Sequence, residues 1–403
     1  MSAGGAATLR PLRGYGRHGH CRRQQAEKGA NMPHEAIFSS GYRDARKKFI
    51  GAAQRCGATL TEYLLPDKRG PEDESLTTDV ATLGPRDAES ALLILSGTHG
   101  LEGPAGSAIQ TAFLEQLSGT DVPDGMRIVL IHAVNPWGFA WQSRTTEDNV
   151  DLNRNFLDFD SPLPENPGYR ELHEIICRGD MTERAQVEVL SALDEYESRH
   201  GYRALSDALG RGQYEFPTGL SYGGREPAWS NRTLRAILDA ELGMARRIGV
   251  IDWHTGRGEF GDAFYLCFSP VGSRAFERAA DWWGYERLTA KDEIGEAYEG
   301  EAPPPRTGLL MNGMDAALPG QLAGAVIEIG TYEPRRVVRA EIIDRWLKFE
   351  AKREAPLASR LRQEMVEAFF PAAPQWRQAV IDNGLEAATK ALEGVVRWHT
   401  DTP

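Results

Sequence analysis

The chain has 403 residues, of which 41% are hydrophobic, so it is long enough to bury a sizeable core. Its formal net charge of −12 argues against nucleic acid as a partner, and no stretch approaches the ~18 consecutive apolar residues of a membrane span. The cysteines, Cys21, Cys56, Cys177 and Cys267, lie far apart and form no CxxC pair. This spacing argues against a zinc finger or a thioredoxin-like site and favours a reducing, cytoplasmic location.

The N-terminal region differs in composition from the rest of the chain. Residues 1–31 are rich in Gly and Arg, contain almost no acid and lack the apolar core of a secretory signal. We interpret them as a disordered or artefactual extension, with Met32 as the expected start of the protein proper. Beyond it, Ser39 or Ser40 is expected to cap a helix that buries Phe49 on its apolar face.

From there, strand-like and helix-like segments alternate. Strands are predicted over residues 58–65, 76–83, 91–97, 127–136, 248–253, 262–269 and 323–330. Helices are predicted over residues 103–117, 230–245 and 273–284, in a helical insertion over 169–213 and in a C-terminal segment over 371–403. The alternation is typical of an α/β sheet with helices on both faces. Since no linker divides the chain, we expect a single domain over residues 36–370 with the C-terminal segment packed on it.

Polar residues follow three of the apolar strands. His99 and Glu102 lie in a Gly-rich turn after the strand 91–97, His254 follows IGVIDW, and Glu328 lies within GAVIEIG. Side chains at the carboxyl ends of strands meet at the edge where open α/β sheets place their chemistry. Two histidines and one glutamate supply the three protein ligands of a catalytic zinc ion, and the remaining carboxylate could activate a water molecule. His132 also ends a strand, but no matching partner motif accompanies it.

A polar loop follows the strand 127–136 and carries further candidates. Arg144 and Arg154 offer guanidinium groups that suit a carboxylate or a developing oxyanion. Asp151 could accept a hydrogen bond from a zinc-bound imidazole, or it could cap a helix or turn. Arg144 has a plainer alternative too, since it could pair on the surface with Glu147 or Asp148.

Taken together and in this order, these motifs resemble those of the zinc carboxypeptidases of the carboxypeptidase A type. HGLEG, R…DLNRNF, DWHTG and EIGT carry the resemblance, which extends to the succinylglutamate desuccinylase and aspartoacylase branch. Residues 36–370 resemble an uncharacterised bacterial carboxypeptidase-like group within that superfamily. The resemblance implies a mixed, mostly parallel eight-stranded sheet between helices.

The resemblance also implies a role for each motif residue. His99, Glu102 and His254 would be the zinc ligands, and Glu328 would be the general base and acid. Arg144 would polarise the scissile carbonyl. The terminal carboxylate of the substrate would be held by Asn153 and Arg154.

One feature departs from the family pattern. Carboxypeptidases of this type carry a mobile Tyr upstream of the catalytic Glu, and the stretch from Arg306 to Ala325 contains none. Tyr222 or Tyr298 would have to substitute. The expected substrate is therefore either a small peptide or an N-acyl amino acid, cleaved by a metallocarboxypeptidase or by a deacylase.

Two alternatives belong to other classes of protein. GLSYG, residues 219–223, matches the GxSxG nucleophile elbow, which would make Ser221 and His254 part of a serine hydrolase. Pro217 before it and Pro227 after it indicate a loop rather than the strand and helix that this motif requires. The second alternative is a carboxypeptidase-like protein that has lost catalysis and binds a ligand or partner.

Overall fold

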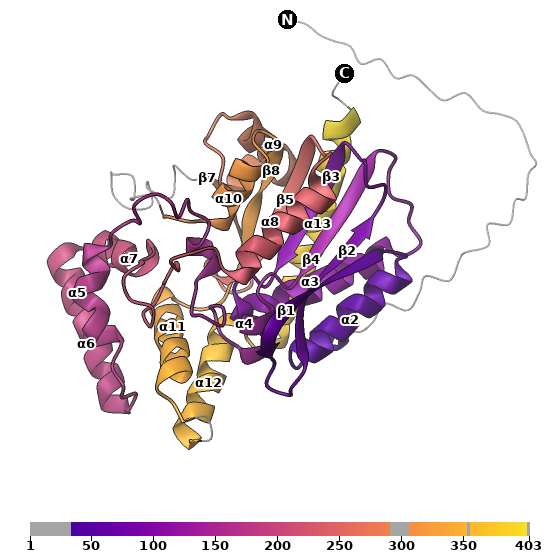
Figure 1. The fold of residues 1–403 in the computed structure, drawn as a ribbon. Helices are drawn as coiled ribbons and strands as arrows, with labels where there is room; N and C mark the ends of the chain where they lie inside the picture. The colour runs from indigo at the N-terminus through magenta and orange to yellow at the C-terminus, as the bar shows by residue number, and fades with distance from the viewer. Residues whose placement is uncertain (1–33, 291–305, 353–354, 401–403) are drawn as a thin grey trace, which may run out of the picture. The chain divides into compact units, whose positions relative to one another are not determined.

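Eight strands form one mixed sheet in the order β1-β2-β4-β3-β5-β8-β6-β7 (Figure 1). The structure is a computed structural model that describes residues 34–290, 306–352 and 355–400. The strands are β1 (Thr59–Arg69), β2 (Ser75–Leu83), β3 (Ser90–Ser96), β4 (Met126–His132), β5 (Arg247–Gly256), β6 (Ala263–Cys267), β7 (Leu288–Ala290) and β8 (Leu322–Gly330).

The centre of the sheet is parallel, and it contains a point where the chain reverses its direction of travel across the sheet. Strands β4, β3, β5 and β8 run parallel to one another. Towards the edges, β1 with β2, β2 with β4, and β6 with β8 form antiparallel pairs, and β7 runs parallel to β6. From β3 the chain passes to β4 on one side, and β5 then pairs with the other side of β3. Ligands of open α/β sheets bind outside the carboxyl ends of strands at such a switch point.

Helices lie against both faces of this sheet. They include α2 (Tyr42–Arg55), α3 (Gly103–Leu117), α8 (Trp229–Leu242), α9 (Arg274–Trp283), α11 (Pro334–Phe349), α12 (Pro356–Phe369) and α13 (Pro374–Thr400). The others are α1 (His34–Ile37), α4 (Pro136–Trp141), α5 (Pro167–Ile176), α6 (Glu183–His200), α7 (Tyr202–Gly210) and α10 (Leu310–Ala317). Helices α5, α6 and α7 fall in the predicted insertion over residues 169–213.

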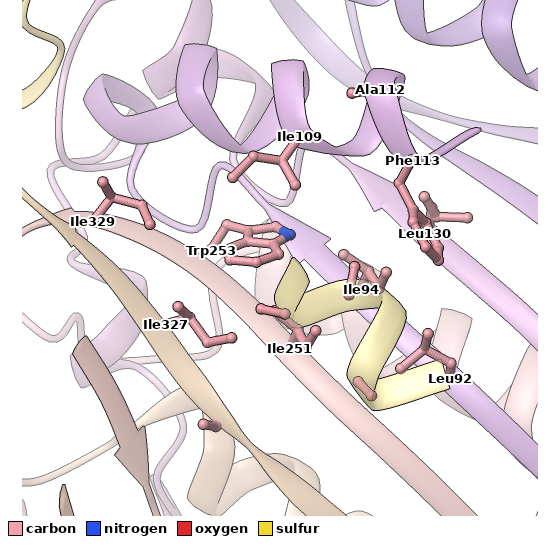
Figure 2. Packing of buried hydrophobic residues seen from close by; sticks show 14 of the residues in the cluster. Leu92, Ile94, Ile109, Ala112, Phe113, Leu130, Ile251, Trp253, Ile327 and Ile329 are labelled. Atoms are coloured by element: carbon pink, nitrogen blue, oxygen red, sulfur yellow. The ribbon is translucent and has the colours of Figure 1, made fainter. Parts of the chain in front are cut away.

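The core alternates between the two faces because successive strand residues point in opposite directions. On one face, Trp253 and its sheet neighbours pack against Ile109 and Phe113 of α3 and against α9 and α13 (Figure 2). On the other face, Val250 packs against α8 and α10. The predicted α/β sheet of eight strands with helices on both faces is therefore confirmed.

The start of α2 corrects one local prediction. The helix buries Phe49 as expected, but its N-cap residue is Gly41 and no side chain caps it. Neither Ser39 nor Ser40 serves as the cap. The backbone N–H of Ser40 instead donates to the carboxylate of Asp44 at 3.4 Å. An acid in the first turn of the helix thus accepts a hydrogen bond from the backbone that precedes the helix.

No helix in the described part of the chain is long and apolar enough to cross a membrane.

Candidate metal centre

The three proposed ligands come from the two strands that meet at the switch point. His99 follows β3, and a 3₁₀ turn over Gly100–Glu102 brings Glu102 back beside it. His254 lies near the end of β5, which pairs with β3. The turn requires glycine at Gly100, since a Cβ there would lie 1.9 Å from the backbone of Gly138. Close backbone packing thus explains why the HGLEG motif has glycine at position 100.

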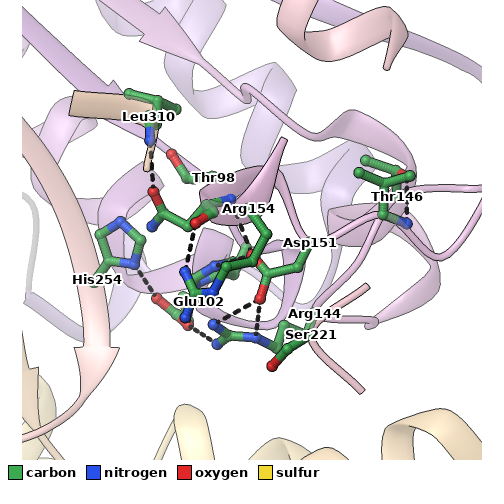
Figure 3. Close-up of polar contacts among 12 residues, drawn as sticks. Thr98, Glu102, Arg144, Thr146, Asp151, Arg154, Ser221, His254 and Leu310 are labelled. Atoms are coloured by element: carbon green, nitrogen blue, oxygen red, sulfur yellow. Dashed lines mark hydrogen bonds and ion pairs between the residues drawn. The ribbon is translucent and has the colours of Figure 1, made fainter. Parts of the chain in front are cut away.

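Both imidazole rings direct the same nitrogen at the same carboxylate. His99 Nδ1 lies 2.8 Å from one oxygen of Glu102. His254 Nδ1 lies 2.9 Å from the other oxygen (Figure 3). All three side chains are buried, and one donor atom from each lies within 4.8 Å of the others. The sequence prediction placed these residues together, and the structure brings them into contact.

The opposite nitrogen of each ring is held by an aspartate. His99 Nε2 lies 3.3 Å from Asp151, and His254 Nε2 lies 2.9 Å from Asp252. Asp252 is fixed in turn by the hydroxyl of Thr98, which donates to it at 2.9 Å. Asp151 also accepts from the backbone N–H of Asn153 at 2.9 Å, so it caps a turn and faces an imidazole at the same time. Such outer partners fix which ring nitrogen faces a metal.

In this cluster, neighbouring charges shift the pKa values more strongly than burial does. Burial alone would raise the pKa of Glu102, but the neighbouring His99 and His254 hold it below its usual range. Burial likewise acts to raise the pKa of Asp151, while Arg144 and His99 hold it well below its ordinary value. Burial would lower the pKa of His254, yet Asp252 and Glu102 raise it well above normal. The carboxylates therefore stay ionised, which is the form that binds metal.

The donor set fits zinc. Two imidazole nitrogens and one carboxylate, with a position left for water, are the ligands of catalytic zinc sites. In both rings the nitrogen opposite the one that faces Glu102 contacts an aspartate. His99, Glu102 and His254 could therefore hold one ion without any further side chain.

Glu328 lies beside this group on the next strand. In the parallel pair of β5 and β8, Glu328 is the register partner of His254, and in-register neighbours project from the same face of a sheet. Its carboxylate is partly exposed and accepts from the backbone N–H of Arg257 at 3.3 Å. Glu328 is thus an acid next to a proposed metal ligand, and it forms no ion pair with any described residue.

Arg144 points into the cluster rather than towards the surface. Its guanidinium lies 3.2 Å from Asp151, 3.4 Å from Glu102 and 3.5 Å from Glu341 of α11. The alternative pairing with Glu147 or Asp148 is therefore wrong. Burial acts to lower the pKa of Arg144, but the surrounding carboxylates raise it further above its already high value.

Arg154 is more deeply enclosed than its proposed role suggests. Its side chain is 2% exposed, and its terminal nitrogens donate to the backbone carbonyls of Asn153 and Gly210. The Nε atom is buried without a partner in the described residues. The amide oxygen of Asn153 accepts from the backbone N–H of Leu310 at 3.1 Å. Within the described residues, Arg154 therefore donates only to backbone carbonyls, and the nearby carboxylate of Asp151 acts on its charge.

The competing serine site has unsuitable geometry. The hydroxyl of Ser221 donates to the carbonyl of Leu209 at 2.7 Å, and His254 is engaged by Glu102 and Asp252. Ser221 lies in a loop between α7 and α8, as the flanking prolines predicted. Of the two candidate tyrosines, Tyr222 is buried in that same loop, and Tyr298 lies outside the described residues.

Sequence reasoning missed the outer residues Asp252 and Glu341. Asp252 precedes His254 by two positions in a strand, and the strand period of two places both on one face, so DWH carried a usable signal. Glu341 lies far along the chain on α11, and nothing near Arg144 in the sequence points to it.

The chain belongs to a protein family. Residues 38–383 match the family described as "Protein of unknown function (DUF2817)". A comparison with curated proteins finds no match.

Several solved structures are similar to this chain. Bovine thrombin-activatable fibrinolysis inhibitor is 12% identical, with 90% of this chain and 99% of that chain covered and a TM-score of 0.48. Carboxypeptidase A from Helicoverpa armigera is 12% identical over 83% and 76%, with a TM-score of 0.42. An aspartoacylase family protein from Mesorhizobium loti is 14% identical over 74% and 68%, with a TM-score of 0.34. The family match covers nearly all of the domain predicted over residues 36–370.

Proposed function

We propose that this protein is a zinc-dependent amide hydrolase that cleaves a small peptide or an N-acyl amino acid in the cytoplasm. The observation that carries the proposal is the buried group of His99, Glu102 and His254, in which both Nδ1 atoms face one carboxylate and both Nε2 atoms are held by aspartates. When bound by three protein ligands, zinc supplies the Lewis acidity that makes water nucleophilic near neutral pH.

Glu328 is the proposed general base. Its carboxylate takes a proton from the attacking water and passes it to the leaving nitrogen, so that amide and water give a carboxylic acid and an amine. Its position beside His254 in the β5–β8 register supports this role. The hydrogen bond from the Arg257 backbone leaves the second carboxylate oxygen available for the proton.

Arg144 is proposed to stabilise the oxyanion of the tetrahedral intermediate. Its guanidinium contacts Glu102, one of the proposed ligands, so it lies at the edge of the metal group. Donors fixed before the reaction are worth the most, typically ~3 kcal/mol each. The hydrogen bond from Arg144 to Asp151 and its ion pair with Glu341 support such fixation.

Arg154, with Asn153, is proposed to bind a carboxylate of the substrate. The buried Nε atom of Arg154, which has no hydrogen-bond partner in the described residues, supports this role. A substrate carboxylate would have to displace the carbonyl of Gly210 from the guanidinium. We expect Arg154→Met to lower kcat/KM for free-carboxylate substrates by about 100-fold, since a charged hydrogen bond contributes ~1.5–3 kcal/mol. The same change should barely affect the amidated forms of those substrates.

The experiment that tests the catalytic role uses zinc-loaded protein and a panel of N-acetyl amino acids and dipeptides. Glu328→Gln should retain zinc and lose turnover by about 10²–10⁴-fold, which is the usual contribution of a general base. Glu333→Gln, a matched change at the start of α11, should leave turnover unchanged. Wild-type turnover in Glu328→Gln would overturn the assignment.

A further inference from the structure

One face of helix α11 contacts the loop that carries Arg144. Glu341, Asp344 and Lys348 occupy positions i, i+3 and i+7 of this helix, and side chains at that spacing project from the same face. Each of the three contacts a residue within the segment 143–146. We call these three side chains the α11 clamp.

Asp344 holds the backbone of Arg144 at its N–H. The carboxylate accepts from this N–H at 2.8 Å and from the hydroxyl of Ser143 at 3.1 Å. Asp344 is buried; burial raises the pKa of its carboxyl group, and the charge of Lys348 opposes this rise. A backbone donor that loses such a partner in an enclosed place is costly, so Asp344 favours one conformation of the chain at Arg144.

The carbonyl of Arg144 is held from another direction, by the turn that carries two of the proposed metal ligands. The backbone N–H of Gly100, between His99 and Glu102, donates to this carbonyl at 3.3 Å. Asp344 and Gly100 thus bond the two backbone polar groups of Arg144. Contacts therefore run from α11 through the main chain of Arg144 to the metal site.

The other two clamp residues hold the guanidinium and the loop after it. Glu341 lies 3.5 Å from the guanidinium of Arg144. The ammonium of Lys348 donates to the hydroxyl of Thr145 at 2.7 Å and to the backbone carbonyl of Thr146 at 2.6 Å. A single helix therefore fixes both the main chain and the side chain of Arg144.

Helix α11 also follows directly on the strand that carries Glu328. Strand β8 ends at Gly330 and α11 begins at Pro334, so only residues 331–333 lie between them. The element that holds Arg144 is thus joined by a short connection to the element that holds the proposed general base.

We propose that Asp344 and Lys348 are positioning residues, which fix Arg144 at the metal site, where its guanidinium contacts Glu102 (Figure 3). The inference rests on the proposed function, in which Arg144 stabilises the oxyanion. A donor that is fixed before the reaction needs no reorganisation as charge develops. Loss of the clamp should therefore slow the chemical step more than it weakens substrate binding.

Hydrogen–deuterium exchange tests the clamp without any turnover. Asp344→Ala removes the acceptor, so the amide hydrogen of Arg144 should exchange about tenfold faster than in the wild type. Asp344→Asn keeps an oxygen that can accept from the same N–H and should restore most of the protection. Glu333→Ala, which removes an exposed carboxylate at the start of the same helix, should leave the exchange of Arg144 unchanged.

Turnover of the zinc-loaded protein on the N-acetyl amino acids and dipeptides tests the catalytic consequence. Asp344→Ala should lower kcat by about tenfold with KM and zinc content unchanged, since a misplaced oxyanion donor affects the transition state. Lys348→Met should lower kcat several-fold. In an Arg144→Met background, Asp344→Ala should cause no further loss, because its effect passes through Arg144. A merely structural role would lower zinc content or add to the loss in that background.

Failure of the clamp and failure of the proposed function give different results. Unchanged exchange at Arg144 in Asp344→Ala, unchanged kcat, or an equal loss in the Arg144→Met background would each overturn the positioning role. A wild type that hydrolyses nothing, with faster exchange in Asp344→Ala, would overturn the proposed function and its catalytic consequence while supporting the fixation of Arg144. Circular dichroism of each variant shows that the fold is retained.

Discussion

Three buried histidines lie at the carboxyl ends of three neighbouring parallel strands, yet their environments differ. His99 follows β3 and His254 lies near the end of β5, and both face the carboxylate of Glu102. His132 ends β4, on the other side of β3. Its ring stacks on Phe49 with centroids 4.6 Å apart, and its Nε2 lies 2.9 Å from the hydroxyl of Ser107.

These histidines differ in the carboxylates that lie next to them. The pKa of His254 is raised well above normal because Asp252 and Glu102 outweigh burial. Around His132 burial dominates and lowers its pKa to about 4, although Asp79 opposes the shift. Position at a strand end thus supplies a candidate ligand. The raised pKa does not itself favour metal binding, since a metal binds the neutral imidazole; what distinguishes His254 from His132 is the adjacent carboxylate of Glu102, which could hold the same ion.

The largest effect is expected from removing the shared acid. Glu102→Gln takes away a ligand and the negative charge between the two imidazoles. We expect zinc affinity to fall by more than the ~10–100-fold that loss of an outer partner costs. Competition with a chromophoric chelator measures the affinity. An unchanged affinity would mean that Glu102 is only a structural partner of the two histidines.

A smaller effect is expected from the aspartate behind His254. Asp252→Asn keeps the shape and removes the charge that faces Nε2, so zinc should bind about 10–100-fold more weakly. The same chelator assay applies, with Asp262→Asn as the control, since Asp262 lies outside the cluster. Equal losses in both variants would contradict a specific role for Asp252.

The smallest effect concerns the third histidine and pH. Because the folded-state pKa of His132 is about 4, the unfolded chain, with a value near ~6.5, binds this proton first as pH falls. Stability is therefore lost below pH ~6.5, by about 1 kcal/mol at pH ~5.5 for this one group. Urea unfolding should show a shallower pH dependence in His132→Gln than in the wild type. Parallel pH profiles would contradict the neutral, buried state of His132.

Most of the fold and the three proposed metal ligands could be predicted from the sequence, because both depend on short local patterns of residues. Apolar runs such as ALLILSG predicted the central strands, and the polar residue after each run predicted a ligand. The short strand β7 was missed because three residues carry little pattern. The acids that hold Arg144 in place were missed for another reason. Asp344 and Glu341 come from a helix about 200 residues downstream, and only tertiary packing brings them together.

The burial of Arg154 was also beyond the sequence. DLNRNF marks a functional loop, but which backbone carbonyls cover a guanidinium depends on how residues 210–212 fold over it.

The most direct measurement is zinc content by mass spectrometry in three proteins prepared alike: the wild type, His99→Ala and His132→Gln. The account predicts about one zinc per chain in the wild type and in His132→Gln, and almost none in His99→Ala. No zinc in the wild type after zinc is supplied, or equal zinc in His99→Ala, would contradict the metal centre at β3 and β5.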